Sequence, residues 1–148
     1  MKIRPATLND LSEIQVCARE AYAQYVPRIG RDPAPMVADF EGQILDEIVS
    51  VAEHNGGVAG FVVFYPRGDH MHLENVAVAS AVQGGGVGSR LIAFVETEAQ
   101  RQGLSHIELY TNEKMTENIP YYRTRGYVET ERRQEDGFNR IFFRKDIG

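Results

Sequence analysis

The stretch Gln83-Gly84-Gly85-Gly86-Val87-Gly88-Ser89-Arg90 is the most informative part of the sequence. It follows an apolar segment with the character of a strand and leads directly into a helical pattern. Glycines allow bare backbone to approach a ligand closely, and the unpaired N–H groups at the start of a helix attract an anion. The stretch therefore predicts a strand, a glycine-rich turn and a helix that together bind a phosphate group.

Two nucleotide-binding patterns fit this stretch poorly. The P-loop pattern G-x-x-x-x-G-K-[ST] needs a lysine for the β- and γ-phosphates, and residues 83–90 contain no lysine. The dinucleotide pattern G-x-G-x-x-G fits Gly84 and Gly86, but Ser89 stands where its last glycine belongs. That pattern also opens a βαβ unit, whereas the preceding segment has the signals of successive hairpins. Nucleotide hydrolysis and dinucleotide binding are therefore disfavoured.

The composition limits the class of protein. A chain of 148 residues is long enough for one domain with its own core and short for two, so we expect a single domain over residues 1–148. The net charge of −5 and the lack of a dense Lys/Arg block argue against nucleic acid as a partner. No apolar run approaches the length of a membrane span, and residues 1–10 lack the apolar block of a signal peptide. We expect a cytoplasmic protein that does not bind a membrane.

The single cysteine, Cys17, excludes an internal disulfide framework and lacks the neighbours of a zinc site. Because buried cysteine is common, we interpret Cys17 as a small core residue on a helix. We expect no metal ion in the functional site.

Hydrophobic periodicity and turn signals predict a mixed α/β architecture. Strands are predicted at 2–5, 49–53, 58–65, 70–78, 105–110, 127–133 and 138–145. Helices are predicted at 11–25, 36–48, 87–102 and 116–125. The order β-α-α-β-β-β-α-β-α-β-β is typical of one mixed, mostly antiparallel sheet flanked by helices.

The strand predicted at 70–78 changes its apolar phase part-way along. Its apolar positions are odd in the first half and even in the second: Met71, Leu73, Val76 and Val78. A regular strand has a period of two, so one face cannot hold both pairs. An inserted residue near Glu74 or Asn75, a β-bulge, would restore a common face, and bulges often lie beside active sites. The alternative is a strand that is buried on both faces and tolerates a mixed phase.

Four segments of the chain match patterns that occur together in one protein family. Gln83–Gly88 matches Q/R-x-x-G-x-G/A, and Tyr121–Tyr127 is similar to F-Y-x-x-x-G-F. Leu73-Glu74-Asn75-Val76-Ala77-Val78 precedes the glycine-rich stretch, and the chain opens with Ile3–Thr7 followed by Asp10-Leu11. Together these segments resemble the GNAT superfamily of acetyl-CoA-dependent N-acetyltransferases, in which the first pattern is the pyrophosphate loop and the third segment is the fourth strand. The resemblance covers nearly the whole chain, and the GNAT fold that it implies agrees with the predicted order of elements.

The resemblance implies that acetyl-CoA is the co-substrate. In the family, the fourth strand pairs with the pantetheine arm as with an added strand, which requires an unpaired strand edge. Family members often place an asparagine seven residues before the tyrosine, and Met115 stands at that position, so either Asn112 or Asn118 takes over its contact. Arg90 is expected to be solvated. The cofactor-binding residues implied are Val76, Ala77, Val78, Gln83, Gly84, Gly85, Gly86, Val87, Gly88, Ser89 and Asn118.

The resemblance also implies direct transfer of the acetyl group to a primary amine in a ternary complex. An alkyl amine with a pKa near 10.4 is only about one part in a thousand neutral at pH 7, so the enzyme must remove a proton or select the free amine. Tyr122 occupies the family's tyrosine position and is the candidate general acid that donates to the CoA sulfur. Glu74 and His72 are the candidate bases, because their spacing of two directs both side chains to one side, toward the acceptor cleft. His70 and His106 are expected at the surface.

The sequence leaves the identity of the acceptor open. The alternatives are a small polyamine-like or drug-like molecule, an amino acid, and the N-terminus or a lysine of a protein. We expect its specificity wall to come from Ala21–Asp46 and from the Gln134–Phe138 turn. A rival of another class is a non-catalytic module that binds an acyl-CoA as a sensor or scaffold, which would need neither Tyr122 nor a base. The resemblance is also compatible with a homodimer formed through the C-terminal strands.

Overall fold

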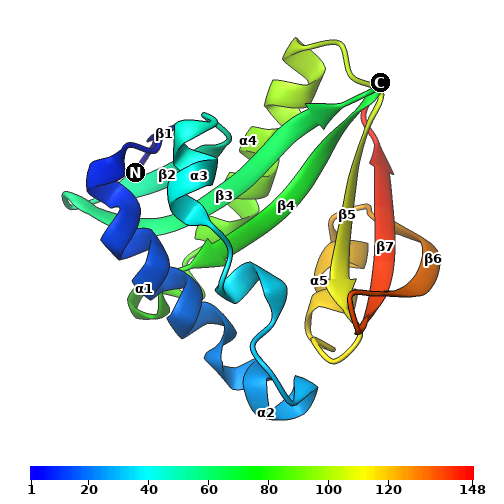
Figure 1. The fold of residues 1–148 in the computed structure, drawn as a ribbon. Coiled ribbons are helices and arrows are strands. Elements are labelled where there is room, and N and C mark those ends of the chain that lie inside the picture. Colours follow the sequence, from blue (N-terminus) through cyan, green and yellow to red (C-terminus); the bar gives the residue numbers. More distant parts are fainter.

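A seven-stranded sheet forms the centre of the structure, with the strand order β1-β2-β3-β4-β5-β7-β6 (Figure 1). The computed structural model describes residues 1–148. Neighbouring strands run antiparallel except for β4 and β5, which run parallel. The strands are β1 (Lys2–Pro5), β2 (Val49–His54), β3 (Gly57–Arg67), β4 (His70–Val78), β5 (His106–Asn112), β6 (Val128–Glu135) and β7 (Phe138–Asp146).

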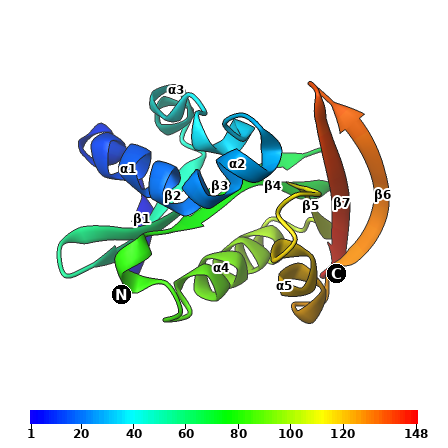
Figure 2. The same ribbon diagram turned by 90° about the horizontal axis from the view of Figure 1, so that it is seen from below.

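Helices cover both faces of the sheet (Figure 2). They are α1 (Leu11–Tyr22), α2 (Val26–Ile29) and α3 (Phe40–Leu45) on one face, and α4 (Val87–Arg101) and α5 (Asn118–Thr124) on the other. Each face has its own apolar core: Ile14, Phe40 and Phe61 belong to the first, and Val62 and Leu91 to the second. None of these helices combines the length and apolar character that spanning a membrane requires.

The predicted order of elements is confirmed, with the single-turn helix α2 added after α1. A hairpin turn joins β2 and β3 at Asn55 and Gly56, whose φ angles are 52° and 79°. Positive φ at both central residues suits the right-handed twist of the two strands. Cys17 is buried on α1, as expected, and its burial raises the pKa of the thiol to about 12.

The helix predicted at 36–48 is wrong at both ends. The chain forms a 3-10 turn at Ala34–Met36, and α3 begins only at Phe40. The side chain of Asp39 accepts a hydrogen bond from the Gly42 N–H at 3.1 Å, so it caps a new helix instead of continuing one. Val37, which fitted the apolar stripe, is 60% exposed. The apolar spacing was therefore right for the short helix and misleading for the segment before it.

The predicted bulge in β4 is confirmed at Glu74. Val63 of β3 pairs with Asn75 and the next residue, Phe64, pairs with Leu73, so Glu74 has no partner in the ladder. The extra residue restores a common face: the apolar residues on both sides of it now pack on the α4 core, and they are Met71, Leu73, Val76 and Val78. Asn75 and Ala77 face α1 instead.

The parallel contact between β4 and β5 is short. It joins only His70, Met71 and His72 to residues 106–108. Beyond this point the two strands separate, as Figure 1 shows, and β5 continues along β7. The separation leaves one edge of β4 unpaired from Leu73 onward, which is one residue before the bulge at Glu74 that bends the strand. The sheet thus contains a wedge-shaped opening between β4 and β5.

Candidate active site

A groove follows the unpaired edge of β4 to the start of α4, and we call it the β4 groove. Its walls come from β4, the glycine-rich loop, α5 and the end of α1. All but one of the predicted cofactor-binding residues line it: Val76, Ala77, Val78, Gln83, Gly84, Gly86, Val87, Gly88, Ser89 and Asn118. The exception is Gly85, whose N–H donates to the Val82 carbonyl at 3.3 Å and is therefore turned back into the loop. Gly85 as a cofactor-binding residue stays a prediction.

The glycine-rich loop shapes the end of the groove. Gly84 and Gly86 have φ angles of 86° and 82°, which side chains rarely adopt, and Gly86 stands immediately before α4. The first N–H groups of α4 lack partners within the helix and lie where the groove ends. A Cβ atom on Gly88 would lie only 2.8 Å from the Tyr121 hydroxyl oxygen. Glycine at position 88 thus lets the Tyr121 hydroxyl lie close to the backbone at the start of α4.

Arg125 adds a positive charge at the same end of the groove. Its Nη2 and Nε donate to the Ser89 hydroxyl at 2.5 and 3.2 Å, and its Nη1 donates to the Tyr121 carbonyl at 2.9 Å. The guanidinium also stacks on the Tyr121 ring, 3.5 Å from its centroid. Charge and helix N-terminus therefore act together on an anion at this position. Arg90, on the first turn of α4, is exposed and does not line the groove.

The unpaired edge of β4 is held in place by side chains. The Tyr22 hydroxyl, at the end of α1, donates to Asn75 Oδ1 at 2.7 Å and lies 3.1 Å from the Val76 carbonyl oxygen. Asn75 in turn donates from Nδ2 to the Pro35 carbonyl at 3.0 Å. Gln83 Nε2 lies 3.4 Å from the Val78 carbonyl. These contacts hold a bare strand edge beside the groove, in position to pair with an extended ligand.

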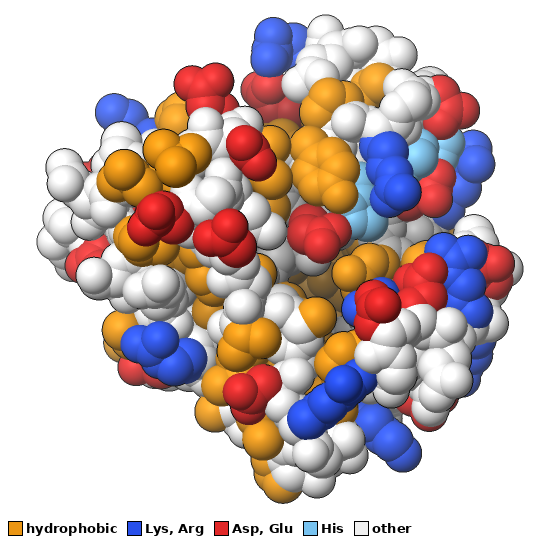
Figure 3. All heavy atoms as spheres, in the orientation of Figure 1, with side chains coloured by type: hydrophobic (Ala, Val, Ile, Leu, Met, Phe, Trp, Pro, Cys, Tyr) orange, Lys and Arg blue, Asp and Glu red, His pale blue; other side chains and the backbone are white.

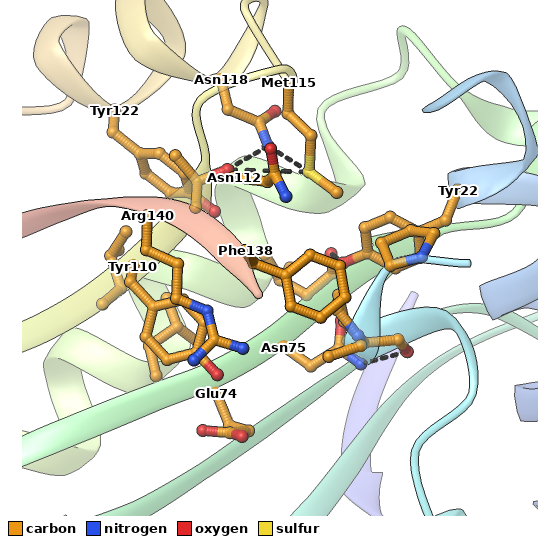
Figure 4. A pocket seen from close by; sticks show the side chains of 17 residues that line it. Tyr22, Glu74, Asn75, Tyr110, Asn112, Met115, Asn118, Tyr122, Phe138 and Arg140 are labelled. Atoms are coloured by element: carbon orange, nitrogen blue, oxygen red, sulfur yellow. Dashed lines mark hydrogen bonds between the residues drawn. The ribbon is translucent and has the colours of Figure 1, made fainter. Parts of the chain in front are cut away.

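A second pocket lies deeper in the wedge, and we call it the inner pocket. It encloses about 550 Å³ including its open mouth. Figure 4 shows Glu74, Tyr110, Phe138 and Arg140 around it. Part of the predicted specificity wall is present, because residues 33–35 and Phe138 line the pocket.

Tyr122 lies where the two hollows meet, since it lines both the β4 groove and the inner pocket. The side chain is 7% exposed, and its hydroxyl has no hydrogen-bond partner in the protein. Burial raises the pKa of Tyr122 well above its ordinary value of 10. The phenol therefore stays protonated at neutral pH and can donate a hydrogen bond into the junction.

Asn118 and Asn112 are now distinguishable. Asn118 lines both the groove and the inner pocket, and its Nδ2 donates to the Thr111 hydroxyl at 3.0 Å. Asn112 lines the inner pocket only, and its Oδ1 accepts from the Lys114 N–H at 2.9 Å. The geometry thus favours Asn118 for a ligand that follows the groove.

Glu74 and His72 point to the same side, as predicted, and form a hydrogen bond of 2.5 Å between Oε2 and Nε2. This bond, which is stronger than the opposing effect of burial, lowers the pKa of Glu74 below its ordinary 4.5. Of these two side chains, that of Glu74 lines the inner pocket and that of His72 does not. His72 faces another cleft, which we call the outer polar cleft and which Tyr65, Arg67 and Glu108 also line. Figure 3 shows charges of both signs and histidines around the hollow on this face.

His106 is buried, with 2% exposure, so the expectation of a surface position is wrong for it. It stands opposite His70 in the short parallel ladder, and the two rings stack with centroids 4.9 Å apart. Its nitrogens lie 2.7 Å from the Ser105 hydroxyl and 2.7 Å from Glu108 Oε2. Asp69, His70 and His106 place potential ligand atoms within 4.8 Å of one another, a grouping that the sequence did not predict. These polar contacts explain how a histidine is accommodated in the interior.

Comparison with known proteins identifies the family. The profile of the Acetyltransferase (GNAT) family matches residues 11–127. The chain belongs to the GNAT family. An aminoalkylphosphonate N-acetyltransferase of Salmonella typhimurium strain LT2 is 29% identical over 100 residues, and this alignment spans 62% of the chain and 64% of the relative.

Solved GNAT structures share the fold over the whole chain. The crystal structure of Ard1 from Thermoplasma volcanium superposes with a TM-score of 0.78 at 19% identity, and covers 99% of this chain and 97% of the other. The structure of yncA from Salmonella typhimurium, a putative acetyltransferase with its cofactor acetyl-CoA, has a TM-score of 0.74 at 21% identity. It covers 100% of this chain and 94% of its own. At these identities the likeness establishes the GNAT fold alone.

Several residues of this GNAT site were missed by sequence reasoning. Arg125 follows α5 by one residue and reaches the glycine-rich loop only because α5 packs beside α4. Tyr121 also lines the groove. Tyr22 and Arg140 come from the two ends of the chain and meet in the wedge. No local pattern marks any of them, because their neighbours are far away in sequence.

Proposed function

We propose that the chain is an N-acetyltransferase that moves an acetyl group from acetyl-CoA directly to a primary amine while both substrates are bound. The observation that supports this most is the meeting of the β4 groove and the inner pocket at the unpaired hydroxyl of Tyr122. Ligands in the two hollows would meet beside a proton donor. The Salmonella relative is named as an N-acetyltransferase, and the yncA structure contains acetyl-CoA.

The β4 groove fits the chemistry of acetyl-CoA. The free amides at the start of α4 and the guanidinium of Arg125 suit the pyrophosphate. The unpaired edge at Val76 and Val78 suits the amide groups of the pantetheine arm. When bound, acetyl-CoA supplies an acetyl group that is activated as a thioester.

Tyr122 is proposed to stabilise the departing thiolate. Its raised pKa keeps the phenol protonated, so a proton is always present for donation. A thiol ionises near pH 8.5, below the pKa of the phenol, so complete transfer of the proton to the thiolate would be uphill. A hydrogen bond from Tyr122 that strengthens as negative charge develops on sulfur is therefore the main contribution we expect.

Glu74 is proposed to hold the acceptor amine and to receive its proton. With a lowered pKa, its carboxylate is ionised at neutral pH and attracts an ammonium group. The bound ammonium must first lose one proton, because only the neutral amine has a lone pair that can attack the thioester. As the new C–N bond forms, the nitrogen becomes acidic and gives a second proton to Glu74. His72 and Glu74 both line the outer polar cleft, and we assign His72 the role of positioning Glu74 and passing the proton to solvent.

The activity itself is tested with acetyl-CoA and a panel of amines, with release of free thiol as the readout. We expect release that depends on the amine. Tight binding of acetyl-CoA with no thiol release for any amine would favour the non-catalytic sensor instead.

Replacing Arg125 with glutamine should weaken the binding of coenzyme A about three- to tenfold, because it removes about 1 kcal/mol of charge interaction with the phosphates. Arg90→Gln is the matched control, since it removes an exposed arginine near the same loop. Isothermal titration measures both dissociation constants. The KM for S-acetylpantetheine, which has no pyrophosphate, should be equal in the wild type and in Arg125→Gln. If the KM for S-acetylpantetheine rose as much as the dissociation constant of coenzyme A, Arg125 would support the fold and would not bind the phosphates.

Replacing Tyr122 with phenylalanine should lower kcat at least tenfold and leave the dissociation constant of acetyl-CoA within about twofold, because the hydroxyl acts on charge that develops during the reaction. Tyr127→Phe is the control. Tyr127 is also buried and its ring lies 5.8 Å from that of Tyr122, but it lines neither hollow. Unchanged turnover in Tyr122→Phe would remove this residue from the mechanism.

Replacing Glu74 with glutamine should lower kcat/KM for amines more than tenfold at pH 7. Because the pKa of Glu74 is lowered from 4.5, the carboxylate is ionised above this pH and the advantage of the wild type should be constant there. As the pH falls below 4.5, protonation makes the wild type resemble the variant. In His72→Ala the main cause of the lowered pKa is lost, so the advantage should disappear at a higher pH. If neither variant changes the acidic limb of the pH profile, neither residue serves as the base.

A cytoplasmic location and a homodimer formed through the C-terminal strands stay proposals. β6 is the last strand of the sheet, so its outer edge is available for pairing.

A further inference from the structure

Two side chains of opposite charge line the inner pocket without pairing with each other. The carboxylate of Glu74 bonds to His72. The guanidinium of Arg140, on β7, forms its ion pairs with Glu135 at 3.1 Å and with Asp136 at 3.7 Å. Figure 4 shows the Arg140 guanidinium and the Glu74 carboxylate at the same end of the pocket. A molecule bound there therefore meets a negative and a positive group at once.

Arg140 is oriented in a way that leaves donors free. Its side chain is only 9% exposed, and the guanidinium lies 4.3 Å from the centroid of the Tyr110 ring. Both ion pairs use Nη1, and the hydrogen bond to Glu135 is the one that the guanidinium donates within the protein. Nε and Nη2 are not among the buried unpaired atoms, so they face the open space of the pocket and can donate to an acceptor oxygen there.

The charge of Arg140 acts across the pocket. It contributes to the lowered pKa of Glu74 and opposes the rise in the pKa of Tyr110, so both groups lie within its field. A fixed pair of opposite charges in a partly desolvated pocket selects a ligand with the complementary pair. The Nε–Nη2 edge of a guanidinium is also the geometry that binds two oxygens of a carboxylate or phosphonate.

We infer that the acceptor is a small zwitterion, a primary amine that carries an oxyanion, with the oxyanion on Nε and Nη2 of Arg140 and the ammonium group beside Glu74. This inference names the acceptor class of the function proposed above and rests on that function. An internal lysine side chain or the N-terminus of a protein has no oxyanion on the same small unit and would leave Nε and Nη2 of Arg140 without an acceptor.

The test compares acceptors that share one amine and differ in the second group. Amino acids with one, two and three carbons between nitrogen and carboxylate are paired with their carboxamides and with the matching aminoalkylphosphonates. Acetyl-CoA is kept saturating, and thiol release gives kcat/KM for each. We expect at least one oxyanion series to exceed its carboxamides more than tenfold in kcat/KM. The chain length at the maximum reports the spacing between the two charges.

Arg140→Gln should bring the ratio of kcat/KM for the acid to that for the carboxamide close to one. Arg133→Gln is the matched control. Arg133 also pairs with Glu135, at 3.0 Å, and stacks on an aromatic ring, that of Phe142, but it does not line the inner pocket. Arg133→Gln should therefore keep the wild-type ratio. Arg140→Lys, which keeps the charge without the two-donor edge, should retain part of the preference, and thermal unfolding verifies that each variant is folded.

Three results would overturn the inference. Equal kcat/KM for acids and carboxamides in the wild type would refute it while the acetyltransferase function stands. An equal loss of preference in Arg133→Gln and Arg140→Gln would assign the effect to the β6–β7 turn rather than to the guanidinium. Absence of thiol release with every amine would overturn the proposed function as well as the acceptor class.

Discussion

The short parallel contact between β4 and β5 is the constraint on which the site depends. Three residue pairs hold the two halves of the sheet together, and beyond them the strands separate. A strand edge without a partner exposes backbone donors and acceptors, which proteins normally cover. Here the exposed edge lies inside a groove, and side chains such as Tyr22 and Gln83 contact part of it. The opening is thus built into the ladder and does not depend on a flexible loop.

The bulge at Glu74 gives this opening its chemistry. Without an extra residue, β4 could not present apolar side chains to the α4 core along its whole length. The same residue, freed from the ladder, places a carboxylate in the inner pocket and in contact with His72. A single backbone irregularity therefore satisfies the core, bends the strand edge and positions an ionised group. The helix N-terminus and Arg125 supply the opposite charge at the far end of the β4 groove, so the two ends of the site favour different ligands.

Much of this arrangement could be predicted because local physical rules determine it. The glycine-rich loop has positive φ values at Gly84 and Gly86, which few other residues tolerate. The apolar phase change in β4 required an extra residue, and the structure places that residue at Glu74. The predicted bounds of the helix at 36–48 were wrong, because apolar spacing alone cannot show that Asp39 begins a new helix. The prediction of a surface position for His106 was wrong, because its burial depends on His70, which is its neighbour only across the ladder.

The sequence by itself determined the order of the elements, the anion-binding loop, the bulge and the family resemblance, because each follows from the spacing of neighbouring residues along the chain. Only the tertiary structure decided how far β4 and β5 stay paired, that Tyr122 lies at the junction of two hollows, and that Arg125 and Arg140 serve opposite ends of the site. These features depend on side chains brought together from distant segments. Backbone conformation is governed by local sterics and hydrogen bonding, whereas a charged pocket is assembled by packing over the whole chain.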